Sequence, residues 1–329
     1  MENIQHMDTC SNQHQFQLMN NGYNSVFQLG KMSVGLVVPI ESYTSSPVPT
    51  MKEHVARAKL VEELGFSSVW LRDVPFNVPS FGDAGQLFDP FVYLGLLAAE
   101  TEKISLGVAS IVLPLRHPAH VAKASASVDV LSNGRLILGV ASGDRPQEYP
   151  AMNINYEHRG ELFREGFDYI RKMHTSDPVL NNVFGRFTGE IDMLPKPTSN
   201  KLPLLITGGS QQSPEWIAKN GDGWMLYPRE PKIQERIIRD WNERVKVTER
   251  PPQPIMQPLY FDLLESSDSK PQPIHLGFRS DTKYLLEYLK SLEAIGVNHV
   301  ALNLRFNQSN IDATLETLAK KVLPEFDRE

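Results

Sequence analysis

Apolar and polar positions along the chain form alternating blocks that are typical of strands and helices in turn. Residues 33–39 are an almost continuous apolar run, as expected for a strand that is buried on both faces. The apolar positions at about 51–64 recur every three or four residues and predict a helix, with Thr50 as its N-cap and Gly65 at its end. The first unit of the chain is therefore a strand followed by a helix.

The same alternation continues to the end of the chain. Further strands are predicted at 66–71, 104–110, 135–142, 203–208, 223–227, 255–263 and 298–304. Further helices are predicted at about 90–101, 118–131, 158–174, 213–220, 231–246, 281–295 and 311–320. Strictly alternating strands and helices imply a parallel sheet, and eight units favour a closed ring over an open sheet. The predicted fold class is α/β, a (β/α)8 TIM barrel.

Two segments depart from this alternation. Residues 183–193 have glycines at turn positions and predict a β-hairpin, which makes an insertion after the fourth strand. Residues 264–279 are acidic and rich in Ser and Pro, and they predict a loop. No Gly-x-Gly-x-x-Gly turn follows the first strand, which argues against a doubly wound dinucleotide-binding fold.

Length and N-terminal composition set the domain organisation. The 329 residues suggest two domains by length alone, but a single barrel with insertions commonly exceeds about 250 residues. Residues 1–22 are rich in Asn, Gln and His without a strand or helix period, and are predicted to be a disordered N-terminal tail. Residues 23–329 are predicted to form one barrel domain, with Val26, Phe27 and Leu29 closing its bottom.

Composition argues against several function classes. The formal net charge is −6 with both signs mixed along the chain, which is unlike a nucleic-acid-binding surface. Cys10 is the one cysteine, so no internal disulfide or thiolate cluster can form. The chain has no apolar run of about 18 residues and no signal-peptide pattern, so we expect a cytoplasmic protein without a membrane partner. Neither a metal site nor a serine hydrolase is predicted, because the histidine spacings and the Gly-x-Ser-x-Gly elbow that mark them are missing.

Candidate chemistry is sought in the loops that follow the strands, because barrel enzymes carry their active sites there. After the strand at 203–208, Gly208 and Gly209 would let backbone amides approach an anion. Ser210 would donate a hydroxyl, and the start of a helix would add positive partial charge. The pattern fits a phosphate cradle, and it fits equally a tight turn that binds nothing.

The fourth predicted strand ends in a second candidate site. Small residues at Ser142 and Gly143 leave room for a flat ring or for ligand contacts to the backbone. Arg145 would pair with a phosphate or a carboxylate, or else with Glu148 or Asp144 in a capping turn.

Two more strand ends carry candidates. Ala109 and Ser110, at the end of the third predicted strand, permit a planar ligand or simple barrel packing. Arg72 and Asp73 end the second strand, where they would hydrogen-bond a ring or a substrate, or form a mutual salt bridge.

The order of these motifs resembles the bacterial luciferase-like monooxygenase family of flavin-dependent barrels. The matching segments are ELGFSSVWLRD (63–73), LGVASIVLPLRHPAHVAKASASVDVLSNGRLILGVASGD (106–144), LPLLITGGS (202–210), KNGDGWMLYP (219–228) and GVNHVALNLRF (296–306). The block around LSNGRLILGVASG is the most specific of them. The resemblance covers about residues 23–326 and implies a TIM barrel with an insertion after strand 4, often as a homodimer.

The resemblance also implies where a flavin-like cofactor lies. The ring would lie near Ser110 and Ser142, and the phosphate near the loop 208–210. A non-proline cis peptide at Ala109–Ser110 would form a bulge under the ring. Relatives often have a catalytic histidine where this chain has Val74 after Asp73, so histidine-assisted luciferase chemistry is not expected.

The function that follows is a flavin-dependent oxidoreductase, a monooxygenase that uses reduced FMN and oxygen on a small organic substrate. The cofactor-binding residues would be Ser110, Ser142, Gly143, Arg145, Gly208, Gly209 and Ser210, with Asp73 as the catalytic residue. Arg279 and Arg305 are further candidates for substrate or phosphate pairing. A separate flavin reductase would deliver the reduced cofactor.

Two alternatives keep the same fold. The resemblance also covers enzymes that use a deazaflavin coenzyme for hydride transfer, and a non-catalytic flavin-binding protein fits the missing histidine. The loops 74–88, 144–157 and 264–280 are expected to surround the site, but their composition does not identify a substrate.

Overall fold

The computed structural model describes residues 15–264 and 270–327. In this part of the chain, eight parallel strands form a closed ring, because β12 pairs with β1 and β8 pairs with β9. The predicted (β/α)8 barrel is therefore confirmed. In ring order the strands are β1 (Ser33–Val37), β2 (Ser68–Leu71), β3 (Ser105–Val112), β4 (Leu136–Ala141), β7 (Leu204–Thr207), β8 (Trp224–Met225), β9 (Ile255–Leu263) and β12 (His299–Asn303).

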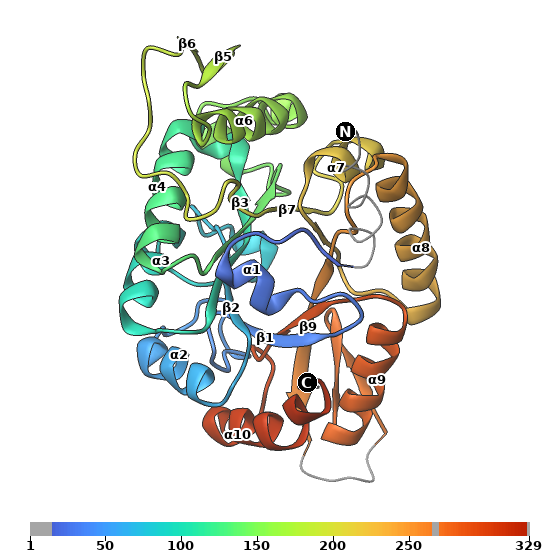
Figure 1. The fold of residues 1–329 in the computed structure, drawn as a ribbon. Coiled ribbons are helices and arrows are strands. Elements are labelled where there is room, and N and C mark those ends of the chain that lie inside the picture. The colour runs from blue at the N-terminus through green and yellow to red at the C-terminus, as the bar shows by residue number, and fades with distance from the viewer. Residues whose placement is uncertain (1–14, 265–269, 328–329) are drawn as a thin grey trace, which may run out of the picture.

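Helices surround the ring on its outer side (Figure 1). These outer helices are α2 (His54–Glu63), α3 (Pro90–Glu100), α4 (Pro118–Leu131), α6 (Arg159–Met173), α7 (Pro214–Asn220), α8 (Pro231–Val247), α9 (Thr282–Ala294) and α10 (Ile311–Lys321). Two short helices, α1 (Asn21–Val26) and α5 (Glu148–Ala151), lie before β1 and after β4 in the chain. The bounds of α4 are those predicted from its pattern. None of the helices in the described residues is long and apolar enough to cross a membrane.

The first outer helix begins differently from its prediction. Glu53, at φ +55°, is the N-cap residue of α2, and it makes no side-chain capping bond. Thr50 does not cap the helix, because α2 starts at His54 and the Thr50 hydroxyl donates to the buried carboxylate of Glu41 at 3.2 Å. The predicted end is confirmed, since Gly65 follows α2 with a φ of +86° that favours glycine.

The N-terminal side of the barrel is closed by α1. Val26 and Phe27 are buried against barrel residues such as Trp70, as predicted, but Leu29 is 45% exposed and does not contribute. The tail is shorter than expected, because Phe16 is buried and Asn20 caps α1 by accepting from the Tyr23 amide at 3.0 Å. Residues 1–14 of the expected tail lie outside the described residues.

The insertion after the fourth strand is an antiparallel hairpin that follows α6. Its strands are β5 (Val179–Asn182) and β6 (Gly185–Thr188), so it begins and ends earlier than the predicted 183–193. In Figure 1 the hairpin projects beyond α6, away from the barrel axis.

The segment predicted as a loop at 264–279 contains a second hairpin. Strands β10 (Gln272–Ile274) and β11 (Gly277–Ser280) are antiparallel, and β11 pairs in parallel with the C-terminal half of β9. The prediction was wrong for these residues, and 265–269 lie outside the described residues. Because β8 is only two residues long, β11 takes its place beside the end of β9.

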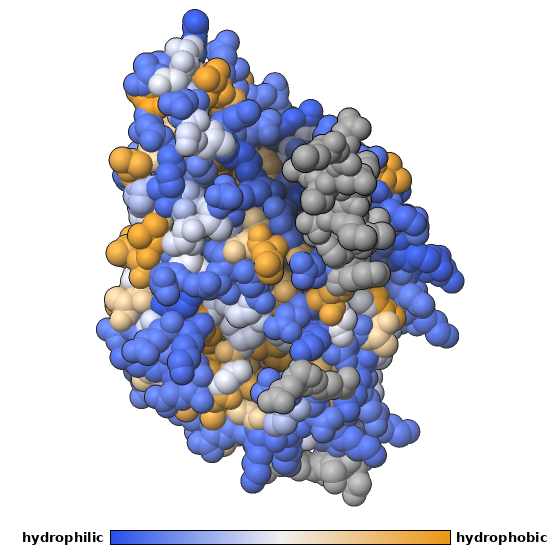
Figure 2. Space-filling model, in the orientation of Figure 1, coloured by the Kyte–Doolittle hydropathy of each residue, from blue (hydrophilic) through white to orange (hydrophobic). Residues whose placement is uncertain are grey.

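Figure 2 shows this face of the molecule as largely hydrophilic, with separate hydrophobic groups over α3 and α4. Val92 and Leu96 on α3 are 74% and 40% exposed, and Leu131 at the end of α4 is 71% exposed.

Candidate functional site

The C-terminal ends of the barrel strands are called the mouth below, and β3 ends there in a bulge. The register of β3 against β4 shifts between Val108 and Ile111, and the Ala109–Ser110 peptide is cis. Both expectations from the resemblance are thereby confirmed. The Ser110 and Thr207 hydroxyls hydrogen-bond each other across the inside of the barrel, although β4 lies between their strands. This contact brings the end of β7 next to the bulge.

The loop after β7 is an array of left-handed residues. Gly208, Ser210 and Gln211 have φ values of +54°, +42° and +58°. Among the described residues, none accepts a hydrogen bond from the amides of Gly209, Ser210 and Gln211. A Cβ added at Gly209 would meet no atom within 4 Å, so open space lies beside that residue. Successive free amides in such a conformation form a concave anion site.

Two details of the predicted cradle need correction. The Gly208 amide is not free, because it donates to the carbonyl of Met225 at 2.9 Å. The Ser210 hydroxyl donates to the carbonyl of Thr207 at 2.7 Å, so the free donor of this residue is its backbone amide.

The start of α6, which carries the cation Arg159, contacts this loop, and the sequence analysis did not identify it. The Gln212 side chain donates to the Gly160 carbonyl at 2.7 Å, which holds the start of α6 against the loop. Arg159, the first residue of α6, stacks on Tyr156 at 3.8 Å and donates to its carbonyl at 3.0 Å. Sequence spacing gave no indication of this contact, because it joins segments about 50 residues apart.

The end of β4 is more tightly packed than expected. A Cβ at Gly143 would lie 2.7 Å from Val112 and 2.8 Å from the Tyr149 hydroxyl, so no room for a flat ring remains at that atom. Ser142 is buried, and its carbonyl accepts from the Tyr149 hydroxyl. These two residues shape the mouth through packing.

Arg145 and Glu148 form a loose pair at the rim. Their charged groups are 3.7 Å apart, beyond hydrogen-bond distance, and Arg145 stacks on Phe81 at 4.2 Å. Burial raises the pKa of Glu148 to about 7, with Arg145 opposing and Asp73 and Asp144 adding to the increase. Glu148 was considered only as a partner of Arg145, yet it is the carboxyl here that titrates near neutral pH.

Asp73 has the contacts of a structural residue. Arg116 donates to both of its oxygens, at 2.9 and 2.7 Å, and the Val112 amide donates at 3.1 Å. The carboxylate is 1% exposed, so proton exchange with a ligand at the mouth does not fit this arrangement. The predicted mutual pair with Arg72 does not form either.

Arg72 instead belongs to a cluster that draws on four neighbouring strands of the ring. Arg72 and Arg305 both contact the same carboxylate oxygen of Asp83, at 2.8 and 3.1 Å. Tyr43 donates to the other oxygen at 3.1 Å. Although burial alone would raise it, the pKa of Asp83 is lowered by Arg72, the Gly85 amide and Arg305.

Tyrosines complete this cluster at the mouth. Burial raises the pKa of Tyr260, which lies within electrostatic range of Arg72, Asp83 and Arg305, so its hydroxyl stays neutral. Tyr227, after β8, also has a pKa raised by burial although 49% of the residue is exposed.

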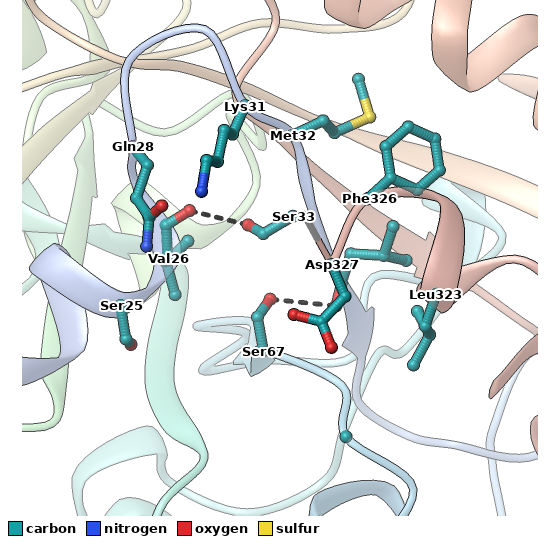
Figure 3. Close-up of a pocket in the computed structure, with 12 residues that line it drawn as sticks. Ser25, Val26, Gln28, Lys31, Met32, Ser33, Ser67, Leu323, Phe326 and Asp327 are labelled. Carbon is teal, nitrogen blue, oxygen red and sulfur yellow. Dashed lines mark hydrogen bonds between the residues drawn. The ribbon is translucent and has the colours of Figure 1, made fainter. Parts of the chain in front are cut away.

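The opposite end of the barrel holds a pocket of about 240 Å³ (Figure 3). Ser33 at the start of β1 and Ser67 just before β2 line it together with Phe326 and Asp327 after α10. Barrel enzymes carry out chemistry at the C-terminal ends of their strands, so this pocket is not a candidate reaction site.

Comparison with known proteins identifies a family and relatives that match most of the barrel sequence. The family model described as luciferase-like monooxygenase matches residues 32–263. An uncharacterized protein of Mycobacterium tuberculosis is 31% identical over 199 residues, which are 55% of this chain and 70% of that protein. The F420-dependent hydroxymycolic acid dehydrogenase of the same organism is 28% identical over 201 residues, covering 60% of this chain and 53% of that protein.

Solved structures share the fold. An F420-dependent secondary alcohol dehydrogenase in complex with an F420-acetone adduct superimposes with a TM-score of 0.73 at 17% identity, over 91% of this chain and 100% of that one. The oxygenating constituent of 3,6-diketocamphane monooxygenase from Pseudomonas putida, in complex with FMN, superimposes with a TM-score of 0.70 at 14% identity. The match covers 90% of this chain and 99% of that one.

Proposed function

This chain belongs to the luciferase-like monooxygenase family, and from that premise we propose that it is a flavin-dependent oxidoreductase that uses FMN on a small organic substrate. The observation that carries the proposal is the array of free amides at Gly209, Ser210 and Gln211, which faces open space next to the β3 bulge. A phosphate and a planar ring joined to it need these two features side by side.

The residues present fit such a cofactor. The three amides and the nearby Arg159 would hold the phosphate, because several N–H donors and a guanidinium match its oxygens. Ser110 and Thr207 point into the barrel above the bulge and would contact the ring. Gly208, Ser142 and Gly143 keep a supporting role, since they fix the strand ends from which these groups project.

When bound, reduced FMN would supply the electrons that activate oxygen. The chain positions the cofactor, excludes water through the packed residues of β3 and β4, and holds a proton at the Glu148 carboxyl near neutral pH. Asp73 positions Arg116 and the end of β3. A separate flavin reductase would deliver the reduced cofactor, because no second cofactor-binding domain accompanies the barrel in the described residues.

A deazaflavin-dependent enzyme is the second candidate, and the 28% identity to an F420-dependent dehydrogenase favours it. The reaction would then be hydride transfer instead of oxygenation. Fluorescence titration of the chain with FMN and with F420 separates the two, and oxygen consumption with reduced FMN separates an oxygenase from a flavin-binding protein without activity.

Replacement of Gly209 tests the phosphate site. We expect Gly209→Asp to weaken cofactor binding at least about tenfold, because a carboxylate would lie next to the phosphate. Gly209→Asn is the matched control, because it has the same size without the charge, and it should bind the cofactor more tightly than Gly209→Asp. Equal affinities for Gly209→Asp and Gly209→Asn would place the phosphate elsewhere.

A further inference from the structure

Three arginines at the mouth differ in how their charge is balanced. Arg279 pairs with the buried carboxylate of Asp262. Arg145 faces Glu148, and Asp144 lies nearby. Arg305 has no carboxylate of its own, because it shares Asp83 with Arg72. Two guanidinium groups and one ionised carboxylate leave a surplus positive charge at this point.

The surroundings of this charge supply donors. Arg305 is held between the rings of Tyr43 and Phe306, at 4.9 and 5.2 Å, and its Nε has no hydrogen-bond partner among the described residues. Tyr43 and Tyr260 are neutral, because burial raises the pKa of both hydroxyls. An unbalanced guanidinium beside such hydroxyls is arranged for an anion.

The cluster lies on the other half of the mouth from the phosphate loop. Its residues come from β9, β12, β1 and β2 and the loops that follow them, which are four consecutive strands of the ring. Ser110, Thr207 and the amides of 209–211 belong to β3 and β7 across the barrel. Arg72 and Arg305 keep 19% and 12% of their side chains exposed, so a ligand in the mouth can reach them.

We propose that Arg72 and Arg305, with the hydroxyl of Tyr260, bind the anionic group of the substrate, which is therefore a small organic carboxylate or phosphate ester. This inference deepens the proposed function, and it rests on that function only in taking the mouth as the substrate site. The anion would accept from the guanidinium groups and from the Tyr260 hydroxyl on one side, while Tyr43 keeps donating to Asp83 and the reacting carbon faces the β3 bulge.

The test compares probes of similar size and different charge. Benzoate, phenyl phosphate and the neutral benzamide are titrated into the full chain and followed by ligand-observed NMR, with and without saturating oxidised cofactor. We expect one of the two anions to bind at least about tenfold tighter than benzamide, since a charge-assisted pair contributes on that scale. Which anion is preferred distinguishes a carboxylate from a phosphate substrate.

Variants of Arg305 test whether the preference for an anion over benzamide comes from the cluster of Arg72, Arg305 and the tyrosines. Arg305→Met should remove the preference for the anion and leave benzamide binding unchanged, while Arg305→Lys should retain part of it. Arg305→Met should fold, because Asp83 keeps Arg72, Tyr43 and the Gly85 amide. Arg239→Met, an exposed position on α8, changes the net charge equally and should bind like wild type.

Three results would overturn the inference: equal binding of anions and benzamide, an anion preference that survives Arg305→Met, or displacement of the anion by the cofactor. Failure of the proposed function has a different signature. The chain would then bind neither FMN nor F420, while the anion preference and its loss in Arg305→Met would persist.

Discussion

Glu148 combines burial with incomplete pairing at the scale of a single residue. It is 2% exposed, its Oε1 has no hydrogen-bond partner among the described residues, and Arg145 is too far away for a hydrogen bond. Burial raises its pKa from 4.5 to about 7, so the folded state disfavours the ionised form. The protonated Glu148 side chain therefore contributes fully to the stability of the folded state below pH 4.5. This contribution is lost as the pH rises through 7, where the folded protein must ionise the buried carboxyl.

We therefore expect Glu148→Gln to gain stability relative to wild type as the pH rises from 5 to 8, by on the order of 1–3 kcal/mol. Urea unfolding at both pH values measures the difference. Glu157→Gln replaces an exposed glutamate in the same loop and should show no such change. If the free energy of unfolding of Glu148→Gln differs from that of wild type by the same amount at pH 5 and pH 8, the expected titration of Glu148 is contradicted.

The site residues show how far sequence reasoning reaches at this scale. The loop at Gly208–Ser210 was predicted from its local glycines at the end of a strand, and the bulge at Ser110 was predicted from the family resemblance. The partners of Arg72 and Asp73 were not, because Asp83 and Arg116 reach them only after the chain folds. The role of a charged residue depends on which group it contacts in the folded chain, and local sequence spacing does not predict that contact.

Strand β11 is the element whose position most affects the mouth. Gly277 pairs with Tyr260 so closely that an added Cβ would lie 1.8 Å from the Tyr260 carbonyl oxygen. We expect Gly277→Ala to destabilise the protein by about 1–3 kcal/mol, because backbone must move to relieve the overlap. It should also speed hydrogen exchange at the Tyr260 amide, which donates to Leu276.

Gly209→Ala is the control for this variant, since its Cβ has open space and the free energy of unfolding should stay within about 0.5 kcal/mol of wild type. If Gly277→Ala behaves in the same way, β11 is not held against β9 as the structure indicates.

Elements with a long pattern were predicted well, and short ones were not. The fourteen residues of α4 run from Pro118 to Leu131, and these bounds match the prediction. β10 and β11 were predicted as loop, because three or four residues with a proline or a glycine have no strand period. Their strand character comes from pairing with β9, which only the folded barrel provides.

At the scale of the whole molecule, α3 presents an apolar surface to the outside. Val92, Leu96 and Ala99 are exposed at helical spacing, while Tyr93, Leu94 and Leu97 are buried on the other side. A helix that is apolar on all sides is normally covered, and a second copy of the chain would cover this face by a twofold contact. This supports the homodimer that the family resemblance implies.

The dimer is tested by charge on α3. We expect wild type to have twice the mass of the chain in light scattering after size-exclusion chromatography, and Val92→Asp with Leu96→Asp to be monomeric. The monomer should stay folded, because both positions are exposed and an aspartate in the first turn of a helix is favourable. Val247→Asp, at an 83% exposed position on α8, adds charge away from α3 and should remain dimeric. A monomeric wild type, or a double variant that still dimerises, would show that α3 is not the interface.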